Sequence, residues 1–238
     1  MKIPDSLLST GVADEPIEYK WTVEIKDRIA TTDADTKPKL SSAVASMSVR
    51  AAFGFGIASA EWVIVRLSKH VNVDEPLQRI EAAWGATIDA RYARFPMPRK
   101  PDKAADYRIA GPIYLAEAVL MDMHNLYVAG NAGVVYMDAV VLSMIAEHVC
   151  RKNAAFKKWT PDVLKRAAER YPKTDKSIAE QRPIARESFD TIDGSNEMSA
   201  EIAQAQLLAS FDPTLNPYLV PEAELVQMGI ERPYPGKA

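Results

Sequence analysis

The chain has few of the side chains that most often carry recognisable chemistry. Its 238 residues include one cysteine, Cys150, and three histidines. A single cysteine excludes an intramolecular disulfide and the paired cysteines of zinc sites, and it agrees with a reducing compartment. In the stretch AEHVCRK we expect Cys150 to be a buried or half-buried thiol rather than a reactive one. We therefore expect a cytoplasmic protein with no cofactor.

Motifs that identify common enzyme families are also missing. The sequence contains no Gly-x-Ser-x-Gly elbow and no Walker-type or dinucleotide-binding loop. Gly54 and Gly56 do form a Gly-x-Gly pair, but a phosphate-binding turn should follow a strand. The preceding residues, SSAVASMSVRAA, favour a helix instead. We therefore interpret the two glycines as points where a neighbouring helix packs closely against the backbone.

A long charge-free run is missing as well. The most apolar region, residues 109–149, is interrupted by several charged and amide side chains, and its best window, 126–146, contains Asn131 and Asp138. A central Asp is costly in a bilayer, so we expect no membrane-spanning helix. The first residues lack the sustained apolar core of a secretory signal. The net charge of −3 favours neither nucleic acid nor an anionic membrane.

What the sequence does contain is helical periodicity. Apolar residues recur every three or four positions along most of residues 1–211, which predicts an all-α, helical-bundle-like single domain. The first two helices are expected over 39–69 and from the Asp74–Pro76 start to Phe95. A third begins at Gly111–Pro112, and a fourth runs from the AGNAG turn (129–133) to Val149. The last two are expected over 159–172, with Thr160 as the cap, and over 197–209.

The C-terminal residues differ in composition. Residues 212–238 are rich in proline and contain spaced apolar residues, and we expect them to form an extended tail docked on the domain, with one short helix at 222–228. The expected anchors are Leu215, Tyr218, Leu219 and Tyr234.

Residues 17–26 fit two patterns. IEYKWTVEIK alternates apolar and polar residues, as in a strand, yet Ile17, Trp21, Ile25 and Ile29 also form a helical stripe. No partner strand is visible elsewhere, so the helix is favoured while the strand stays open.

Two groups of side chains are candidates for a cleft. If helices on either side of Asn131 form a hairpin, His124 and Asp138 lie seven residues from its turn and at the same depth, which suggests an inter-helix polar or metal site. An ion pair or simple exposure explains the same pattern. Charges beside large aromatics give the second group, which comprises Glu61, Arg66, Asp89 and Arg91. Ion pairs at the rim of a core are the alternative.

Charge is distributed unevenly near the C-terminal third. Residues 151–176 contain nine Lys and Arg side chains with interleaved aromatics, which could bind nucleic acid or an acidic partner, or could form a solvated helix face. Two loops are acidic instead, and we take their carboxylates as candidate partner-binding residues: Asp190, Asp193, Glu197, Asp33 and Asp35.

The favoured function is a binding or inhibitory protein of the immunity or antitoxin type, which covers the surface of a toxin or effector protein through complementary shape and charge. The first alternative is a helical enzyme that uses His124 and Asp138. The second is a nucleic-acid-associated protein that uses residues 151–176. The sequence does not fix the identity of the partner or the oligomeric state.

Overall fold

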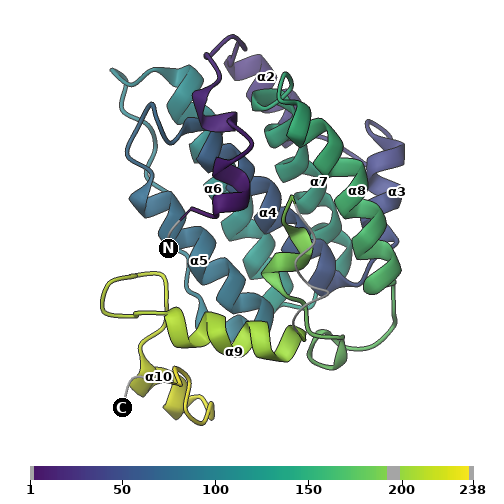
Figure 1. The fold of residues 1–238 in the computed structure, drawn as a ribbon, viewed down its shortest axis with the longest axis vertical. Helices are drawn as coiled ribbons and strands as arrows, with labels where there is room; N and C mark the ends of the chain where they lie inside the picture. Colours follow the sequence, from purple (N-terminus) through teal and green to yellow (C-terminus); the bar gives the residue numbers. More distant parts are fainter. Residues whose placement is uncertain (1–2, 192–198, 236–238) are drawn as a thin grey trace.

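The computed structural model describes residues 3–191 and 199–235, and throughout these residues the protein is helical, with two isolated β-bridges and no β-strand. The predicted all-α class is therefore confirmed. Figure 1 shows the longer helices standing side by side as a bundle, with α9 (Ala200–Ser210) crossing one end.

Helix α4 (Val49–Leu67) forms the centre of the bundle, and all of its residues are buried. It is surrounded by α5 (Asp74–Ile88), α6 (Tyr107–Val128) and α7 (Ala132–Val149). A Cβ atom on Gly54 would lie 2.6 Å from Ile184, and one on Gly56 would lie 2.7 Å from the Met123 sulfur. The interpretation of these glycines as close-packing points is confirmed, because larger side chains there would overlap their neighbours. A neighbouring helix makes the close approach at Gly56, whereas at Gly54 the approach is made by residues 184–189.

The expected continuous helix over 39–69 is wrong in one respect. The chain forms α3 (Pro38–Ala45) and then breaks before α4. At the break, Met47 pairs with Pro172 in a β-bridge, and the Ser48 hydroxyl accepts a hydrogen bond from the Ala51 N–H. Ser48 therefore caps a new helix. Periodicity hid the break because Met47 is fully buried in either arrangement.

Helix α6 begins before the expected start at Gly111–Pro112. Asp106 caps it by accepting a hydrogen bond from the Arg108 N–H, and Pro112 lies inside the helix. A proline at this position leaves the carbonyl four residues earlier without its usual partner. Here the Tyr19 hydroxyl donates to the Arg108 carbonyl at 2.8 Å, which explains why the proline is tolerated.

Helix α8 (Ala154–Arg170) also begins earlier than its sequence signals indicated. Asn153 is the cap and accepts a hydrogen bond from the Phe156 N–H, so the predicted Thr160 cap is wrong. Thr160 instead donates its hydroxyl hydrogen to the Phe156 carbonyl within the helix. Pro161 lies in the middle of α8 rather than in its first turn.

Residues 17–26 are neither wholly helix nor strand. The chain is irregular up to Thr22, which caps α2 (Val23–Ala30). Trp21 is buried at the end of the irregular stretch and lies edge-on to His148. The alternation of apolar and polar residues therefore comes from an irregular segment that precedes α2, and not from a strand.

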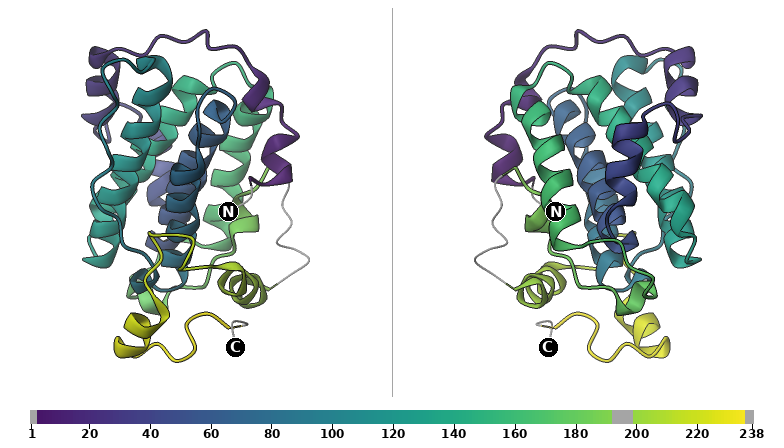
Figure 2. Two further views of the ribbon diagram at one scale, coloured as in Figure 1. Left: turned by 90° about the vertical axis from the view of Figure 1, so that its left-hand side faces the viewer. Right: turned by 90° about the vertical axis from the view of Figure 1, so that its right-hand side faces the viewer.

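The C-terminal residues lie on the end of the bundle opposite α2, as Figure 2 shows. Asn216 donates to the Gln78 carbonyl, and the Val220 N–H donates to the Tyr92 carbonyl at 3.0 Å. Tyr218, Leu219 and Tyr234 are buried, whereas the expected anchor Leu215 is 72% exposed. The remaining short elements are α1 (Asp5–Leu8), η1 (Val12–Asp14), η2 (Ala90–Tyr92), η3 (Ile178–Glu180), η4 (Arg186–Phe189) and α10 (Glu222–Gln227).

Among the described residues, α7 is the helix whose length and composition would allow it to cross a membrane. More than half of it is buried against other helices, and a core helix meets the same test. Its apolar character is accounted for by these contacts.

Candidate functional site

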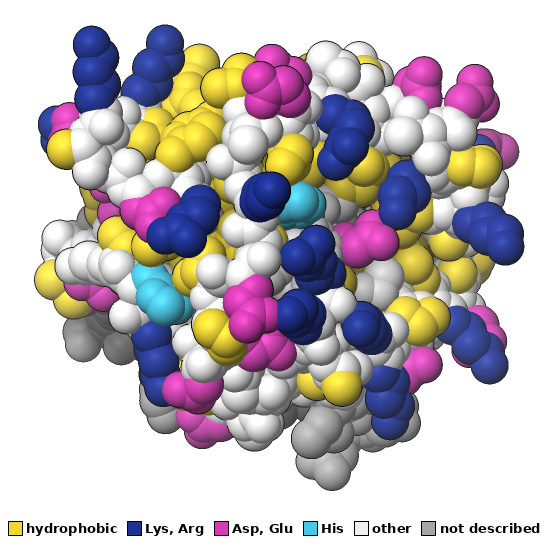
Figure 3. All heavy atoms as spheres, turned by 90° about the horizontal axis from the view of Figure 1, so that it is seen from above, with side chains coloured by type: hydrophobic (Ala, Val, Ile, Leu, Met, Phe, Trp, Pro, Cys, Tyr) yellow, Lys and Arg dark blue, Asp and Glu magenta, His cyan; other side chains and the backbone are white. Residues whose placement is uncertain are grey.

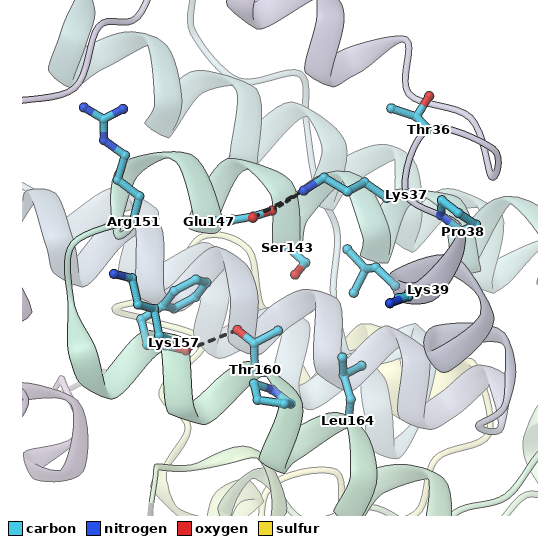
Figure 4. Close-up of a pocket in the computed structure, with 13 residues that line it drawn as sticks. Thr36, Lys37, Pro38, Lys39, Ser143, Glu147, Arg151, Lys157, Thr160 and Leu164 are labelled. Carbon is cyan, nitrogen blue, oxygen red and sulfur yellow. Dashed lines mark hydrogen bonds and ion pairs between the residues drawn. The ribbon is translucent and has the colours of Figure 1, made fainter.

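Helices α3, α7 and α8 lie along one side of the bundle (Figure 1). Residues of these helices and of the chain beside them line a groove with a volume of about 620 Å³ (Figure 4). α3 is only eight residues long and packs on both α7 and α8. The groove lies where α3, α7 and α8 meet. The groove is lined by Thr36, Lys37, Pro38, Lys39, Leu40, Ser143, Glu147, Arg151, Phe156, Lys157, Thr160, Pro161 and Leu164.

The floor of this groove is apolar. Leu40 of α3 and Leu164 of α8 are half-buried at its sides, and Phe156 is buried between α8 and the core. Figure 4 shows the Ser143 hydroxyl of α7 pointing into the same space. A ligand with apolar side chains would remove this surface from water, at about 25 cal/mol per Å² buried.

The rim of the groove is cationic. It carries Lys37, Lys39, Arg151 and Lys157, and Glu147 is the one carboxylate among the lining residues. The Lys37 ammonium bonds that carboxylate at 3.0 Å, as the dashed line in Figure 4 shows. Both side chains of this pair are about half exposed, so the pair contributes at most about 1 kcal/mol.

A second hollow of about 340 Å³ continues the groove beyond the Lys37–Glu147 pair. It shares four lining residues with the groove and adds Arg28, Ile29, Met144 and His148. Figure 3 views the end of the bundle where α2 lies, and Lys and Arg side chains gather across the middle of that face. The trough formed by the two hollows is therefore cationic along its length.

Of the five acidic residues predicted to bind a partner, the structure describes Asp33, Asp35 and Asp190. Asp33 and Asp35 are exposed in the turn that precedes Lys37, and hydrogen bonds from Thr36 lower the pKa of Asp33. Asp190 is half-buried, and burial raises its pKa to about 6. Asp193 and Glu197 lie outside the described residues.

His124 and Asp138 have different surroundings. The His124 Nε2 lies 3.2 Å from the Ala90 carbonyl, its ring packs edge-on against Phe95, and burial lowers its pKa. Burial and the nearby charge of Asp122 raise the pKa of Asp138 to about 7. Positions 122 and 124 point about 200° apart around a helix, so the face of α6 that approaches Asp138 is not the face that carries His124.

A metal site is not formed around these side chains. Within residues 3–191 and 199–235, no three His, Cys, Asp or Glu side chains lie close enough to hold a metal ion. The metal site suggested by the spacing of His124 and Asp138 is therefore not assembled among the described residues, and the His124 Nδ1 and Asp138 Oδ2 atoms are both buried without a hydrogen-bond partner.

The other cleft candidates form ion pairs and hydrogen bonds. Glu61 is 3% exposed and accepts a hydrogen bond from the Arg186 guanidinium at 2.5 Å. Arg66 is fully buried in α4 and donates to the carbonyls of Pro16 and Val149.

Asp89 and Arg91 form an ion pair just after α5. Asp89 also lines a pocket at the end of the bundle away from the groove.

Of the nine cations in the basic segment 151–176, Arg151 and Lys157 line the groove. Other cations in it make contacts within the molecule: Lys152 pairs with Glu18, and Arg166 donates to the Asp190 carbonyl. Lys37 and Lys39 were not singled out by sequence, because they meet Arg151 and Lys157 only through the packing of α3 beside α8.

Comparison of the chain with protein-family models, curated proteins and solved structures finds no match. Function must therefore be argued from the geometry of the molecule itself.

Proposed function

We propose that this protein binds an amphipathic, acidic segment of a protein partner in the groove between α3, α7 and α8, and that it acts by covering that segment. The observation that carries the proposal is the combination of an apolar floor with a cationic rim. Apolar side chains of the segment would occupy the floor, and its carboxylates would lie beside Lys39, Arg151 and Lys157. Such complementarity chiefly sets specificity and the rate of association.

Two other occupants fit the groove less well. A nucleic acid contacts proteins largely through its phosphates and needs a cationic surface that follows the backbone. Here the cations border an apolar floor, which suits apolar side chains and offers little to a phosphate backbone. The enzyme hypothesis relied on His124 and Asp138, which lie in different surroundings and outside the groove.

Covering a segment of a partner would block whatever that segment does. This is how an immunity- or antitoxin-type protein neutralises a toxin or effector, and it needs no reaction centre in the inhibitor. Asp33 and Asp35 precede the groove residue Thr36 in the chain but do not line the groove, so they take no part in this proposal.

The test uses two fluorescein-labelled helical peptides with leucines at every third or fourth position. One carries Glu on both flanks and the other carries Lys at the same positions. We expect the purified full chain to bind the Glu peptide at least about tenfold more tightly, a difference of about 1.4 kcal/mol. Lys157→Glu should weaken that binding about tenfold, because an attractive rim charge becomes repulsive.

Lys158→Glu provides the matched control. Lys158 is the next residue in α8 and is exposed, but it does not line the groove. Its reversal makes the same change in net charge and should leave the affinity within about twofold. Equal affinity for both peptides, or equal loss in both variants, would overturn the proposal.

A further inference from the structure

The hollow of about 340 Å³ that continues the groove brings together cations from three separate stretches of the chain. Arg28 lies in the last turn of α2, and Arg151 lies just after the end of α7. Lys37 immediately precedes α3. Lys37 and Arg151 also line the groove, whereas Arg28 lines the hollow and not the groove. A substitution of Arg28 can therefore test the hollow separately.

The lining of the hollow carries a net positive charge. The three cations accompany one carboxylate, Glu147, and three positive charges with one negative charge give +2 when His148 is neutral. Burial lowers the pKa of His148, and the charges of Arg151 and Arg28 lower it further, so the neutral form predominates at pH 7. Because both guanidiniums act on this one imidazole, they lie on the same part of the surface.

The two guanidiniums carry the excess charge. The Lys37 ammonium bonds the Glu147 carboxylate at 3.0 Å, so the charges of that pair cancel. The Arg151 Nη2 donates to the Glu18 carbonyl at 3.3 Å. Arg28 forms no ion pair within residues 3–191 and 199–235. Both guanidiniums therefore keep unused N–H donors.

Carboxylates beside the hollow do not cancel this charge. Asp27, the neighbour of Arg28 in α2, pairs with Lys26 at 2.7 Å. The Glu18 side chain pairs with Lys152. The hollow is therefore left with two guanidiniums that have no counter-charge of their own.

A phosphorylated side chain matches these two guanidiniums better than a carboxylate does. Phosphoserine carries about −1.5 to −2 charges at pH 7 and three strong acceptor oxygens, whereas a carboxylate carries a single charge. Guanidiniums bind phosphate oxygens through paired N–H donors. Together, the two guanidiniums supply the charge and the donors for one phosphoryl group.

We propose that this hollow binds a phosphorylated side chain of the partner segment, with the phosphoryl group against Arg28 and Arg151. The inference rests on the proposed function, because the hollow continues the groove that would hold the segment. Apolar side chains of the segment would occupy the groove, and the phosphorylated residue would lie beyond them at one end. Phosphorylation of the partner would then strengthen its capture.

The test adds phosphoserine to the fluorescein-labelled Glu peptide. One version carries it one turn before the first leucine, and the other carries it one turn after the last leucine. By fluorescence anisotropy, we expect one of the two to bind the full chain at least about tenfold more tightly than the unphosphorylated peptide. The other should gain no more than about threefold, because its phosphoryl group would lie at the end of the groove away from the hollow.

Arg28→Gln should remove most of the tenfold gain. The affinity for the unphosphorylated peptide should stay within about twofold, because Arg28 does not line the groove. Lys158→Gln is the matched control: it removes the same charge from an exposed residue that lines neither space, and it should preserve the gain. Far-ultraviolet circular dichroism would establish that each variant is folded.

An equal gain for both phosphopeptides would overturn the inference, because the phosphoryl group would then be attracted by the cationic face in general. A gain that survives Arg28→Gln, or one that Lys158→Gln removes to the same extent, would also overturn it. Tighter binding of a duplex oligonucleotide than of either phosphopeptide would assign the cations to nucleic-acid phosphates instead.

Two further outcomes separate this inference from the proposed function. If the unphosphorylated Glu peptide binds and neither phosphopeptide binds more tightly, the inference fails and the proposed function stands. If the unphosphorylated peptide does not bind, both fail.

Discussion

The contact between α4 and α7 and the contact between α3 and α8 show two ways of placing helices side by side. At the first, a Cβ atom on Gly56 would lie 3.3 Å from the Ala139 Cα, so the backbones meet closely. At the second, Leu40 of α3 and Leu164 of α8 line the groove and are only half-buried. A glycine lets the first interface close, whereas the second interface stays partly open as a groove.

The ion pairs of these two regions differ in the same way. Glu61 of α4 and its partner Arg186 are 3% and 17% exposed, whereas Lys37 and Glu147 at the groove are 41% and 54% exposed. A charge buried without its partner is expensive, but an exposed charge is solvated by water. Substitutions in the centre of the bundle should therefore destabilise the protein strongly, whereas substitutions at the groove should change its stability little.

The largest expected effect comes from a side chain placed in the closed interface. Gly56→Leu must displace Met123 and push the α7 backbone away, and we expect it to remove more than about 3 kcal/mol of unfolding free energy or to prevent folding. Urea denaturation followed by circular dichroism measures it. The same substitution in the first turn of α7, Gly133→Leu, should leave stability unchanged or raise it, because a Cβ atom on Gly133 would have no neighbour within 4 Å. Similar losses in both variants would contradict the comparison.

Loss of one partner from the buried Glu61–Arg186 pair should cause the next largest loss of unfolding free energy. Arg186→Met leaves Glu61 buried without its partner and should cost about 3–5 kcal/mol. Lys37→Met at the groove should cost less than about 1 kcal/mol. The double variant Glu61→Gln with Arg186→Met should recover part of the loss, because no uncompensated carboxylate remains at position 61. Equal costs for the two single variants would show that burial does not distinguish the pairs.

A smaller effect on stability is expected from Asp138, a carboxylate on α7 that faces Asp122 of α6. Burial and the charge of Asp122 raise the pKa of Asp138 to about 7, against about 4 in an unfolded chain. The folded state then holds more protons between pH 4 and 7, so the contribution of Asp138 to stability falls as the pH rises through that window.

Asp138→Asn mimics the protonated side chain and should stabilise the protein at pH 8 by about 1–2 kcal/mol, with allowance for solvent screening. At pH 4 the change should be close to zero. Thermal unfolding at several pH values measures the difference. Some pH dependence should persist, because burial also raises the pKa of Glu117 to about 7. A stabilisation that is equal at pH 4 and pH 8 would rule out titration of Asp138 as its cause.

The sequence was sufficient to predict the helical class and the close packing at Gly54 and Gly56, because a helix that is apolar on most sides must be surrounded by other helices. It was less successful with helix ends. Pro112 and Pro161 suggested starts that the structure places inside helices, since Asp106 and Asn153 provide the caps.

The groove could not be predicted from the sequence, because its residues come from three separated stretches, 36–40, 143–151 and 156–164. Their charges become one feature only when α3 packs beside α8. Arg151 and Lys157 were visible within a basic segment, but nothing in the sequence separates them from Lys158, which does not line the groove. The expected pairing of His124 with Asp138 failed for a related reason, since equal depth in a hairpin does not fix the face on which a side chain lies.

Site-specific photo-crosslinking tests the central claim most directly. A photoreactive amino acid would replace Lys157 in one full-length variant and Lys158 in another, each expressed in the cells that naturally make the protein. We predict that position 157 crosslinks to one protein, through a segment in which apolar residues alternate with Asp and Glu, and that position 158 gives much less of the same product. Equal, mixed products from both positions, or a basic segment at position 157, would contradict the claim that this groove is the binding site.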